Sequence, residues 1–185
     1  MTERYSKTAV LLHWIIALLF IGAYAAIKYR HWFTAKGMPE NVTAAQLHFA
    51  FGFSVGVFVL LRVIWRLTHR PPAPLPGPAW QLLAARLTHG LLYFFMIAMP
   101  LTGYMGTRAV PQYLVVIPRF QDSAVYDWFV TGMFGLTWEQ WSKPLSFFHH
   151  FSGENLVWVL IALHISAALY HQFLKRDGLI RRMWF

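Results

Sequence analysis

Histidine is the residue type whose placement in this chain points most directly to chemistry. The segment SFFHHFSGENLVWVLIALHISAALYH, residues 146–171, is almost wholly apolar, yet it carries His149, His150, His164 and His171. Ionisable side chains in such segments are costly to bury and usually mark a functional site. Fourteen helical residues rise about 21 Å and return to within about 40° of the same face. We therefore expect His150 and His164 on one face at two depths, with His171 nearly in line seven residues further on.

Four apolar segments are long enough to carry these histidines into a lipid bilayer, which needs about 20 residues per helix. We expect spans at residues 8–27, 44–65, 85–105 and 147–174. Each should be a helix, because lipid offers no partner to an unpaired backbone group. The fold class expected is all-α: an integral membrane four-helix bundle, built as a single domain over residues 1–185.

The segments that connect these spans differ in kind. Residues 69–78 are rich in proline and are not expected to be helical. Residues 106–146 form a long aromatic connection. Within it, DSAVYDWFV is expected to form a helical turn that lies on the surface, with Asp122 as its N-cap.

The composition supports a membrane protein and excludes several kinds of site. Of the 185 residues, 57% are hydrophobic and 12% are charged, whereas soluble domains carry about 25% charged residues. The chain has no cysteine, which excludes disulfides, thiolate zinc sites and iron–sulfur clusters. The net charge is +9, and the lysine and arginine residues lie at the ends of apolar runs. This pattern argues for a membrane protein and against a nucleic-acid partner.

Lysine and arginine also predict the orientation in the membrane. Four spans place the N-terminus, the proline-rich segment and the C-terminus on one side. Ten of the 16 basic residues lie on that side or at the adjoining helix ends. Because cytoplasmic loops carry the excess of positive charge, we expect both termini in the cytoplasm.

The antiparallel arrangement places a histidine opposite each member of the series. His48 lies at the depth of His150, and His13 lies near the depth of His164. Two neutral imidazoles that face each other across a gap are a suitable ligand set for a six-coordinate haem iron. A copper or zinc site needs ligands that converge at one point. His89, alone on the third span, is expected to be a structural residue or a propionate contact.

The sequence resembles the bacterial cytochrome b(561) family over nearly its whole length. The stretches that carry the resemblance are YSKTAVLLHW, QLHFAFG, VLLRVIWRLTHRPPAP, LTHGLLYFFMIAMPLTGYMG and HHFSGENLVWVLIALHISAALYHQF. The resemblance implies a dihaem protein of the bacterial cytoplasmic (inner) membrane, with two non-covalent haem b groups. Position by position, His13 and His164 would hold the cytoplasmic-side haem, and His48 and His150 the outer one.

The histidine doublet requires a choice between His149 and His150. Asn155 matches a position of the family's motif, and counting back from it selects His150. The spacing of 14 residues to His164 selects the same residue.

The resemblance also implies that electrons pass between a donor on the outer face and a membrane quinone. One activity of the family is oxidation of superoxide with reduction of ubiquinone, and we expect this oxidoreductase activity here. A cationic mouth would raise the encounter rate of superoxide with the outer haem. Its candidate residues are Arg30, Lys36, Arg108, Arg119 and Lys143, which are equally expected as plain solvated loop charges. His171 is the candidate quinone contact, and its alternative role is that of a helix-end side chain that reaches the interface.

Two other functions remain open at this stage. The first is a cytochrome b electron-relay and anchor subunit for a separate dehydrogenase or hydrogenase. The second is a haem-free transporter or structural bundle, which would lack a b-type absorption band.

Overall fold

The structure of the chain, a computed structural model, describes residues 4–111 and 116–184. Within them, four helical segments are long and apolar enough to cross a membrane. Three are continuous α-helices: α1 (Lys7–Phe33), α2 (Pro39–Thr68) and α3 (Ala79–Gly106). The fourth runs from Trp138 to Lys175 and consists of four helical elements in sequence. These elements are α4 (Trp138–Phe151), η3 (Ser152–Leu156), α5 (Val157–Tyr170) and η4 (His171–Lys175).

Every predicted span lies inside one of these helices, and every helix extends beyond its predicted bounds. Local capping residues set where α1, α2 and α4 begin. The Ser6 hydroxyl accepts a hydrogen bond from the backbone N–H of Ala9, and Pro39 occupies the first turn of α2. Thr137 and Gln140 form a capping box that starts α4 nine residues before the predicted fourth span. Hydropathy marks the part of a helix that lipid covers, whereas caps mark where the helix begins.

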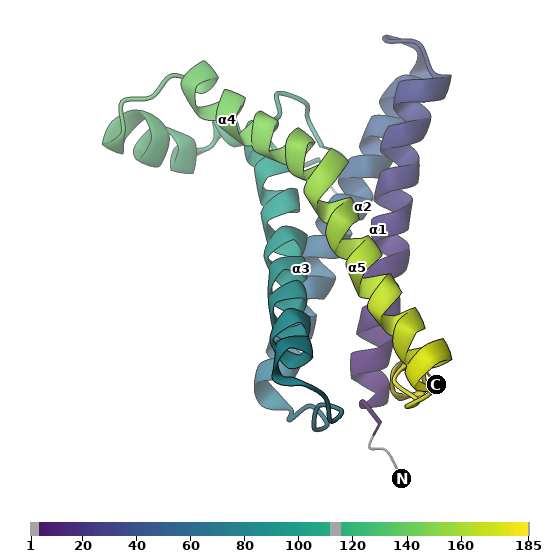
Figure 1. Ribbon diagram of the computed structural model, residues 1–185. Helices are drawn as coiled ribbons and strands as arrows, with labels where there is room; N and C mark the ends of the chain where they lie inside the picture. The colour runs from purple at the N-terminus through teal and green to yellow at the C-terminus, as the bar shows by residue number, and fades with distance from the viewer. Residues whose placement is uncertain (1–3, 112–115, 185) are drawn as a thin grey trace.

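The helices run antiparallel and define two ends of the bundle (Figure 1). The terminal end holds the first and last described residues and the connection between α2 and α3. The loop end holds the connection between α1 and α2 and the longer one between α3 and α4. The helix from α4 to η4 crosses the α1–α2 pair obliquely and passes from the loop end to the terminal end.

The C-terminal segment closes the terminal end. After η4 the chain turns back into η5 (Ile180–Met183). The Met183 carbonyl accepts a hydrogen bond from the Trp14 indole at 2.9 Å. The buried Arg182 donates to the Ala73 carbonyl in the proline-rich segment at 2.7 Å, and its guanidinium lies over the Tyr5 ring. The two terminal segments and the α2–α3 connection are therefore fastened together.

The α3–α4 connection has an apolar cluster of its own and projects sideways from the loop end (Figure 1). It contains η1 (Phe120–Asp122) and η2 (Tyr126–Met133). The buried side chains of Phe120, Tyr126 and Val130 form its core. The expected N-cap, Asp122, is wrong: Ser123 accepts from the Tyr126 backbone N–H at 3.1 Å, while Asp122 pairs with Arg119 at 2.7 Å.

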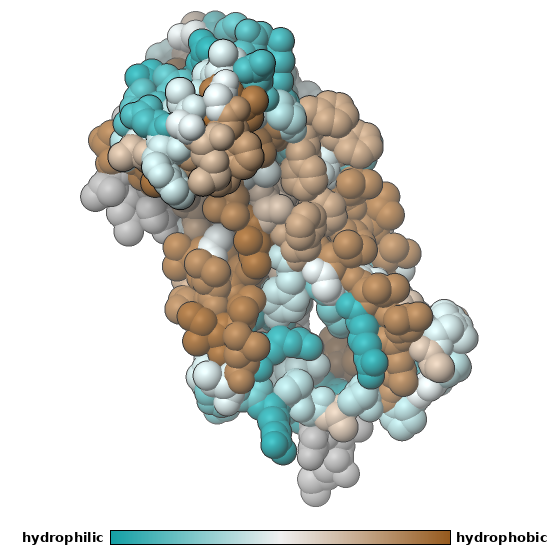
Figure 2. Space-filling view, turned by 90° about the vertical axis from the view of Figure 1, so that its left-hand side faces the viewer, coloured by the Kyte–Doolittle hydropathy of each residue, from teal (hydrophilic) through white to brown (hydrophobic). Residues whose placement is uncertain are grey.

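An apolar layer separates the two ends of the bundle at mid-height. Phe20, Val55, Phe95 and Val157, here called the middle layer, belong to two packed clusters in which Phe20 takes part in both. Phe20, Val55 and Val157 each lie seven residues, about 10 Å along a helix, from a histidine of their own helix. Many large apolar side chains around this level point outward, and Figure 2 shows them as a brown band between more hydrophilic ends. This distribution suits a bundle whose outer surface meets lipid.

Candidate functional site

The terminal end brings together histidines from three helices. The ring centroids of His13 in α1 and His164 in α5 are 6.1 Å apart. The ring centroids of His89 in α3 and His164 are 5.6 Å apart. The predicted proximity of His13 and His164 is therefore present in the structure, and His89 is a third histidine at the same level.

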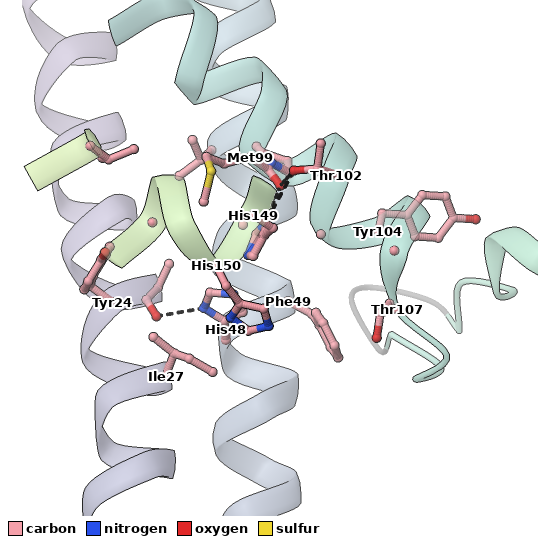
Figure 3. Close-up of a pocket in the computed structure, with 18 of the residues that line it drawn as sticks. Tyr24, Ile27, His48, Phe49, Met99, Thr102, Tyr104, Thr107, His149 and His150 are labelled. Carbon is pink, nitrogen blue, oxygen red and sulfur yellow. Dashed lines mark hydrogen bonds between the residues drawn. The ribbon is translucent and has the colours of Figure 1, made fainter. Parts of the chain in front are cut away.

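The loop end brings together His48 and both members of the doublet. The ring centroids of His48 in α2 and His149 in α4 are 6.1 Å apart. The His150 ring lies 6.0 Å from that of His149 and lines the same cavity. In Figure 3 the three rings extend into one space from α2 and α4. The ring of His149 stands at 6.1 Å from that of His48, and the predicted partner, His150, lines the same cavity.

The spacing of the two pairs fits a metal held between imidazoles. Metal–imidazole nitrogen distances are about 2 Å, so two rings on opposite sides of one metal have centroids about 6 Å apart. Both pairs meet this spacing. Among the described residues, no group of three or more histidine, aspartate or glutamate side chains is arranged to hold an ion. Two ligands at each end suit an equatorial macrocycle better than a tetrahedral zinc or copper site.

Backbone carbonyls orient both rings of the loop-end pair. His48 Nδ1 lies 2.9 Å from the Ala23 carbonyl oxygen in α1. His149 Nδ1 lies 3.0 Å from the Met99 carbonyl oxygen in α3. A ring that donates Nδ1–H to a carbonyl has its Nε2 lone pair available for a metal, and this second contact fixes the ring orientation. At this end, α1 and α3 therefore orient the imidazole rings that α2 and α4 carry.

A cavity of about 260 Å³ surrounds the loop-end histidines. Apolar side chains such as Phe20, Phe49 and Phe95 line it, together with Gly52 and Gly103. A Cβ added at Gly52 would meet nothing within 4 Å, whereas one added at Gly103 would lie 2.8 Å from the His149 ring. Gly103 thus makes room for the His149 ring, whereas Gly52 and the apolar walls leave room for a flat macrocycle beside the ring pair.

The terminal end has a second cavity, of about 460 Å³, between α2 and α3. It is lined by His89, Arg66, Arg86 and Tyr93, and a Cβ added at the lining residue Gly90 would meet nothing within 4 Å. Two guanidinium groups in the wall of this cavity suit an anionic substituent, such as a carboxylate.

The five predicted cationic-mouth residues do not gather at the loop-end cavity. Arg30 lines it, and the Arg30 side chain also contacts the Asn41 amide oxygen at 3.2 Å. Arg119 and Lys143 instead pair with acidic neighbours, Asp122 at 2.7 Å and Glu139 at 2.6 Å. Lys36 and Arg108 are not among the residues that line the cavity. The positive charge beside the histidines is therefore supplied by Arg30.

The structure gives His171 a carboxylate partner that the sequence did not predict. His171 Nδ1 lies 2.5 Å from Asp177 Oδ2, and the other carboxylate oxygen accepts from the Leu179 backbone N–H at 3.2 Å. Both side chains are about one-fifth exposed, at 20% and 24%. A partly accessible imidazole paired with a carboxylate can hold and pass a proton.

Sequence reasoning missed three features of these sites. The role of Gly103 depends on which histidine approaches α3, and nothing in the sequence encodes that. Asp177 follows His171 by six residues, a spacing that regular helix geometry does not bring into contact. The pairing of His149 with His48 had one available signal, the doublet itself.

Comparison with known proteins supports a cytochrome. The family model described as prokaryotic cytochrome b561 matches residues 4–185. The chain is 32% identical over 182 residues to cytochrome b561 homolog 1 of Escherichia coli (strain K12), covering 98% of this chain and 97% of that protein. It is 27% identical over 190 residues to cytochrome b561 homolog 2 of the same organism, covering 98% and 91%. It is 25% identical over 187 residues to the probable superoxide oxidase CybB of Yersinia pestis, covering 99% and 97%.

Proposed function

Because the chain belongs to the prokaryotic cytochrome b561 family, we propose that this membrane electron carrier holds two haem b groups, one at each end of its bundle. Bound haem supplies reversible one-electron chemistry. The proposal is carried by one observation: two imidazole pairs, at opposite ends and on different helices, each with ring centroids 6.1 Å apart. His13 and His164 would hold the terminal-end group, and His48 with one member of the doublet would hold the other.

The terminal end would face the cytoplasm and the loop end the outer side of the inner membrane. The excess of lysine and arginine on the side of the termini supports this orientation. Arg66 and Arg86 line the terminal-end cavity, and Arg182 is fastened into the same end. A membrane-impermeant lysine reagent tests the orientation, because Lys36 in the α1–α2 connection should react from outside and Lys7 should not.

Superoxide would be the electron donor at the loop end. Each superoxide anion gives one electron and leaves as O₂, so two anions supply the two electrons that one quinone needs. The name of the Yersinia relative, probable superoxide oxidase, supports this donor. Arg30 supports it as well, since a guanidinium on the wall of the loop-end cavity attracts a small anion.

Ubiquinone would be the acceptor at the terminal end. Its reduction consumes two electrons and two protons, and the protons must come from the cytoplasmic side. The His171–Asp177 pair is suited to this step, because His171 lies about two helical turns from His164 and both side chains remain partly accessible. His171 would donate a proton to a quinone oxygen, and Asp177 would stabilise the charged imidazolium.

The experiment begins with the absorption spectrum and the haem content of the purified protein. We expect a b-type spectrum with two haems per chain. Stopped-flow mixing with superoxide should then reduce the haem, and added ubiquinone should reoxidise it. A colourless protein would contradict the cytochrome assignment, whereas a haem protein that superoxide does not reduce would contradict the donor and favour relay from a separate dehydrogenase or hydrogenase.

A further inference from the structure

We infer that the segment of residues 119–137, here called the arm, inserts an apolar face into the lipid interface of the leaflet at the loop end. The arm holds η1 and η2 and projects sideways from the bundle, so it lies along the membrane surface (Figure 1). The proposed electron transfer assigns this segment no role, and its contact with lipid is independent of that proposal.

The main helix of the arm, η2, has three faces, because side chains three and four residues apart are neighbours on a helix. Tyr126 and Val130 are buried in the core of the arm. Asp127 and Thr131, each one residue further on, are exposed and polar. Val125 and Trp128, on the other side of the buried pair, are exposed at 60% and 67%. The helix therefore leaves one polar and one apolar face uncovered.

Aromatic contacts extend the apolar face beyond η2. The ring centroid of Phe129 lies 6.1 Å from that of Trp128 and 5.0 Å from that of Phe134. Phe134 and Met133 are also large, apolar and exposed, at 55% and 56%. Exposed apolar patches of this kind mark a contact with another molecule or with a membrane. A tryptophan within such a patch is typical of the boundary between lipid and water.

Distance along the fourth helical segment places the arm at that boundary. Val157 belongs to the middle layer, and Phe147 precedes it by ten residues, on the far side of the π-turn η3. Ten helical residues span about 15 Å, which is also half of a hydrocarbon core about 30 Å thick. Phe147 is 70% exposed, and its ring stacks on that of Phe151, so α4 presents apolar rings up to this level.

The arm joins α4 just above this level. It precedes α4 at Trp138, and the oblique course of α4 adds little further height (Figure 1). The headgroup regions extend the bilayer to about 40–45 Å in all. At this height a segment that projects sideways is surrounded by phospholipid, which makes lipid the occupant of the apolar face.

Charge does not provide the attachment. Residues 116–143 carry two basic and three acidic side chains, a net charge of −1. Both basic side chains are paired, Arg119 with Asp122 at 2.7 Å and Lys143 with Glu139 at 2.6 Å. Anionic phospholipids attract unpaired lysine and arginine, so the apolar face must supply the binding. Insertion should therefore be equal in neutral and anionic bilayers.

Spin labels test the inference in the full chain, which has no cysteine of its own. In nanodiscs of phosphatidylcholine, Val125→Cys and Thr131→Cys place a nitroxide on the apolar and the polar face of one helix. Oxygen, which concentrates in lipid, should relax the label at position 125 more than a water-soluble nickel chelate does. The order should reverse at position 131. Phe147→Cys and Lys36→Cys calibrate the lipid and water limits.

Two results would overturn the inference. Stronger relaxation by the chelate at both positions would place the arm in water. Shielding of position 125 from both reagents, or dipolar broadening between labels, would show that a protein partner or a second copy covers the apolar face. An absorption spectrum and a helix content equal to those of the unlabelled chain show that the labelled protein is folded.

A charge placed on the apolar face should release the arm from lipid. In the Val125→Cys protein, Trp128→Lys should raise relaxation by the nickel chelate severalfold, whereas the matched control Thr131→Lys should leave it unchanged. An equal response to the two lysines would contradict insertion through the apolar face. Without either lysine, adding phosphatidylglycerol to the nanodiscs should change nothing, and insertion that required this anionic lipid would contradict the apolar attachment.

Discussion

The two ends of the bundle place histidines by different means. At the loop end, the rings of His48 and His149 are each tied to a backbone carbonyl of a neighbouring helix. At the terminal end, the rings of His13 and His89 both lie against that of His164, and charged side chains from α2 and α3 line the adjoining cavity. The loop-end site is therefore defined by rigid backbone, whereas the terminal-end site is defined by side chains. Substitutions of small residues should damage the first, and changes of charge should tune the second.

The largest effect is expected from removing one histidine at each end. His48→Ala and His164→Ala should each lose about one haem of two, and redox titration should show that the surviving haem differs between them. His69→Ala is the matched control, because His69 stacks on Trp65 at the helix end, away from both pairs. Loss of both haems from either variant would show that the two ends do not assemble independently.

His89 decides how the terminal-end cluster is divided. Because His13 stands at the same distance from His164 as the loop-end rings stand from each other, we expect His89→Ala to keep both haems. Haem quantification measures this directly. Loss of one haem, with retention in His13→Ala, would make His89 the partner of His164.

A smaller effect is expected from adding a methyl group at Gly103 in α3. Gly103→Ala places a methyl group against the His149 ring, so the loop-end haem should bind more weakly and be lost first on heating or dilution. Gly56→Ala is the control, because a Cβ there would meet Pro100 at an ordinary 3.6 Å. Equal haem loss in the two variants would mean that Gly103 does not act through His149.

A change of charge should shift a redox potential without removing haem. Arg62 donates to the Tyr93 hydroxyl at 2.9 Å and to the Ala9 carbonyl at 3.4 Å, one turn before His13. A nearby positive charge disfavours the oxidised iron, so Arg62→Gln should lower the terminal-end midpoint potential, by roughly tens of millivolts. The loop-end potential should stay constant, and a matching fall at both ends would point to a general structural change.

The smallest effect is expected from the ion pair between α1 and the π-turn. Lys28 and Glu154 lie 2.8 Å apart, with side-chain exposures of 24% and 51%. Because such half-exposed pairs contribute about 1 kcal/mol or less, Glu154→Gln should slightly lower the temperature at which the haem band is lost and keep both haems. A loss of the loop-end haem at ambient temperature would show that the pair holds the π-turn in register.

The sequence predicted the helices well because lipid imposes a simple pattern. Apolar runs of about 20 residues are helices in a bilayer, and the four predicted spans each lie in one. Their ends were missed because capping by Ser6 and Thr137 depends on local hydrogen bonds rather than on hydropathy. The α3–α4 connection was not predicted in detail, since its core of Phe120, Tyr126 and Val130 forms from non-local packing.

The sequence predicted which histidines come together at each end of the bundle, but it did not predict the π-turn that alters the helix register beside the doublet. Matching depths in antiparallel spans predicted that His13 approaches His164 and that His48 approaches the doublet. No pattern in the sequence indicated the π-turn at Ser152–Leu156, which lies between the doublet and His164. Periodicity arguments count residues, whereas a π-turn changes how many residues make one turn.

The middle layer has a consequence for bioenergetics. Its members, Phe20, Val55, Phe95 and Val157, carry no titratable group, and under the proposed function an electron would pass this level between the two haem groups. Moving one elementary charge through the full membrane potential is worth about 2.3 kcal/mol per 100 mV. Turnover in sealed vesicles should therefore be electrogenic and respond to an imposed voltage, in proportion to the share of the membrane field that falls across those aromatic and aliphatic side chains.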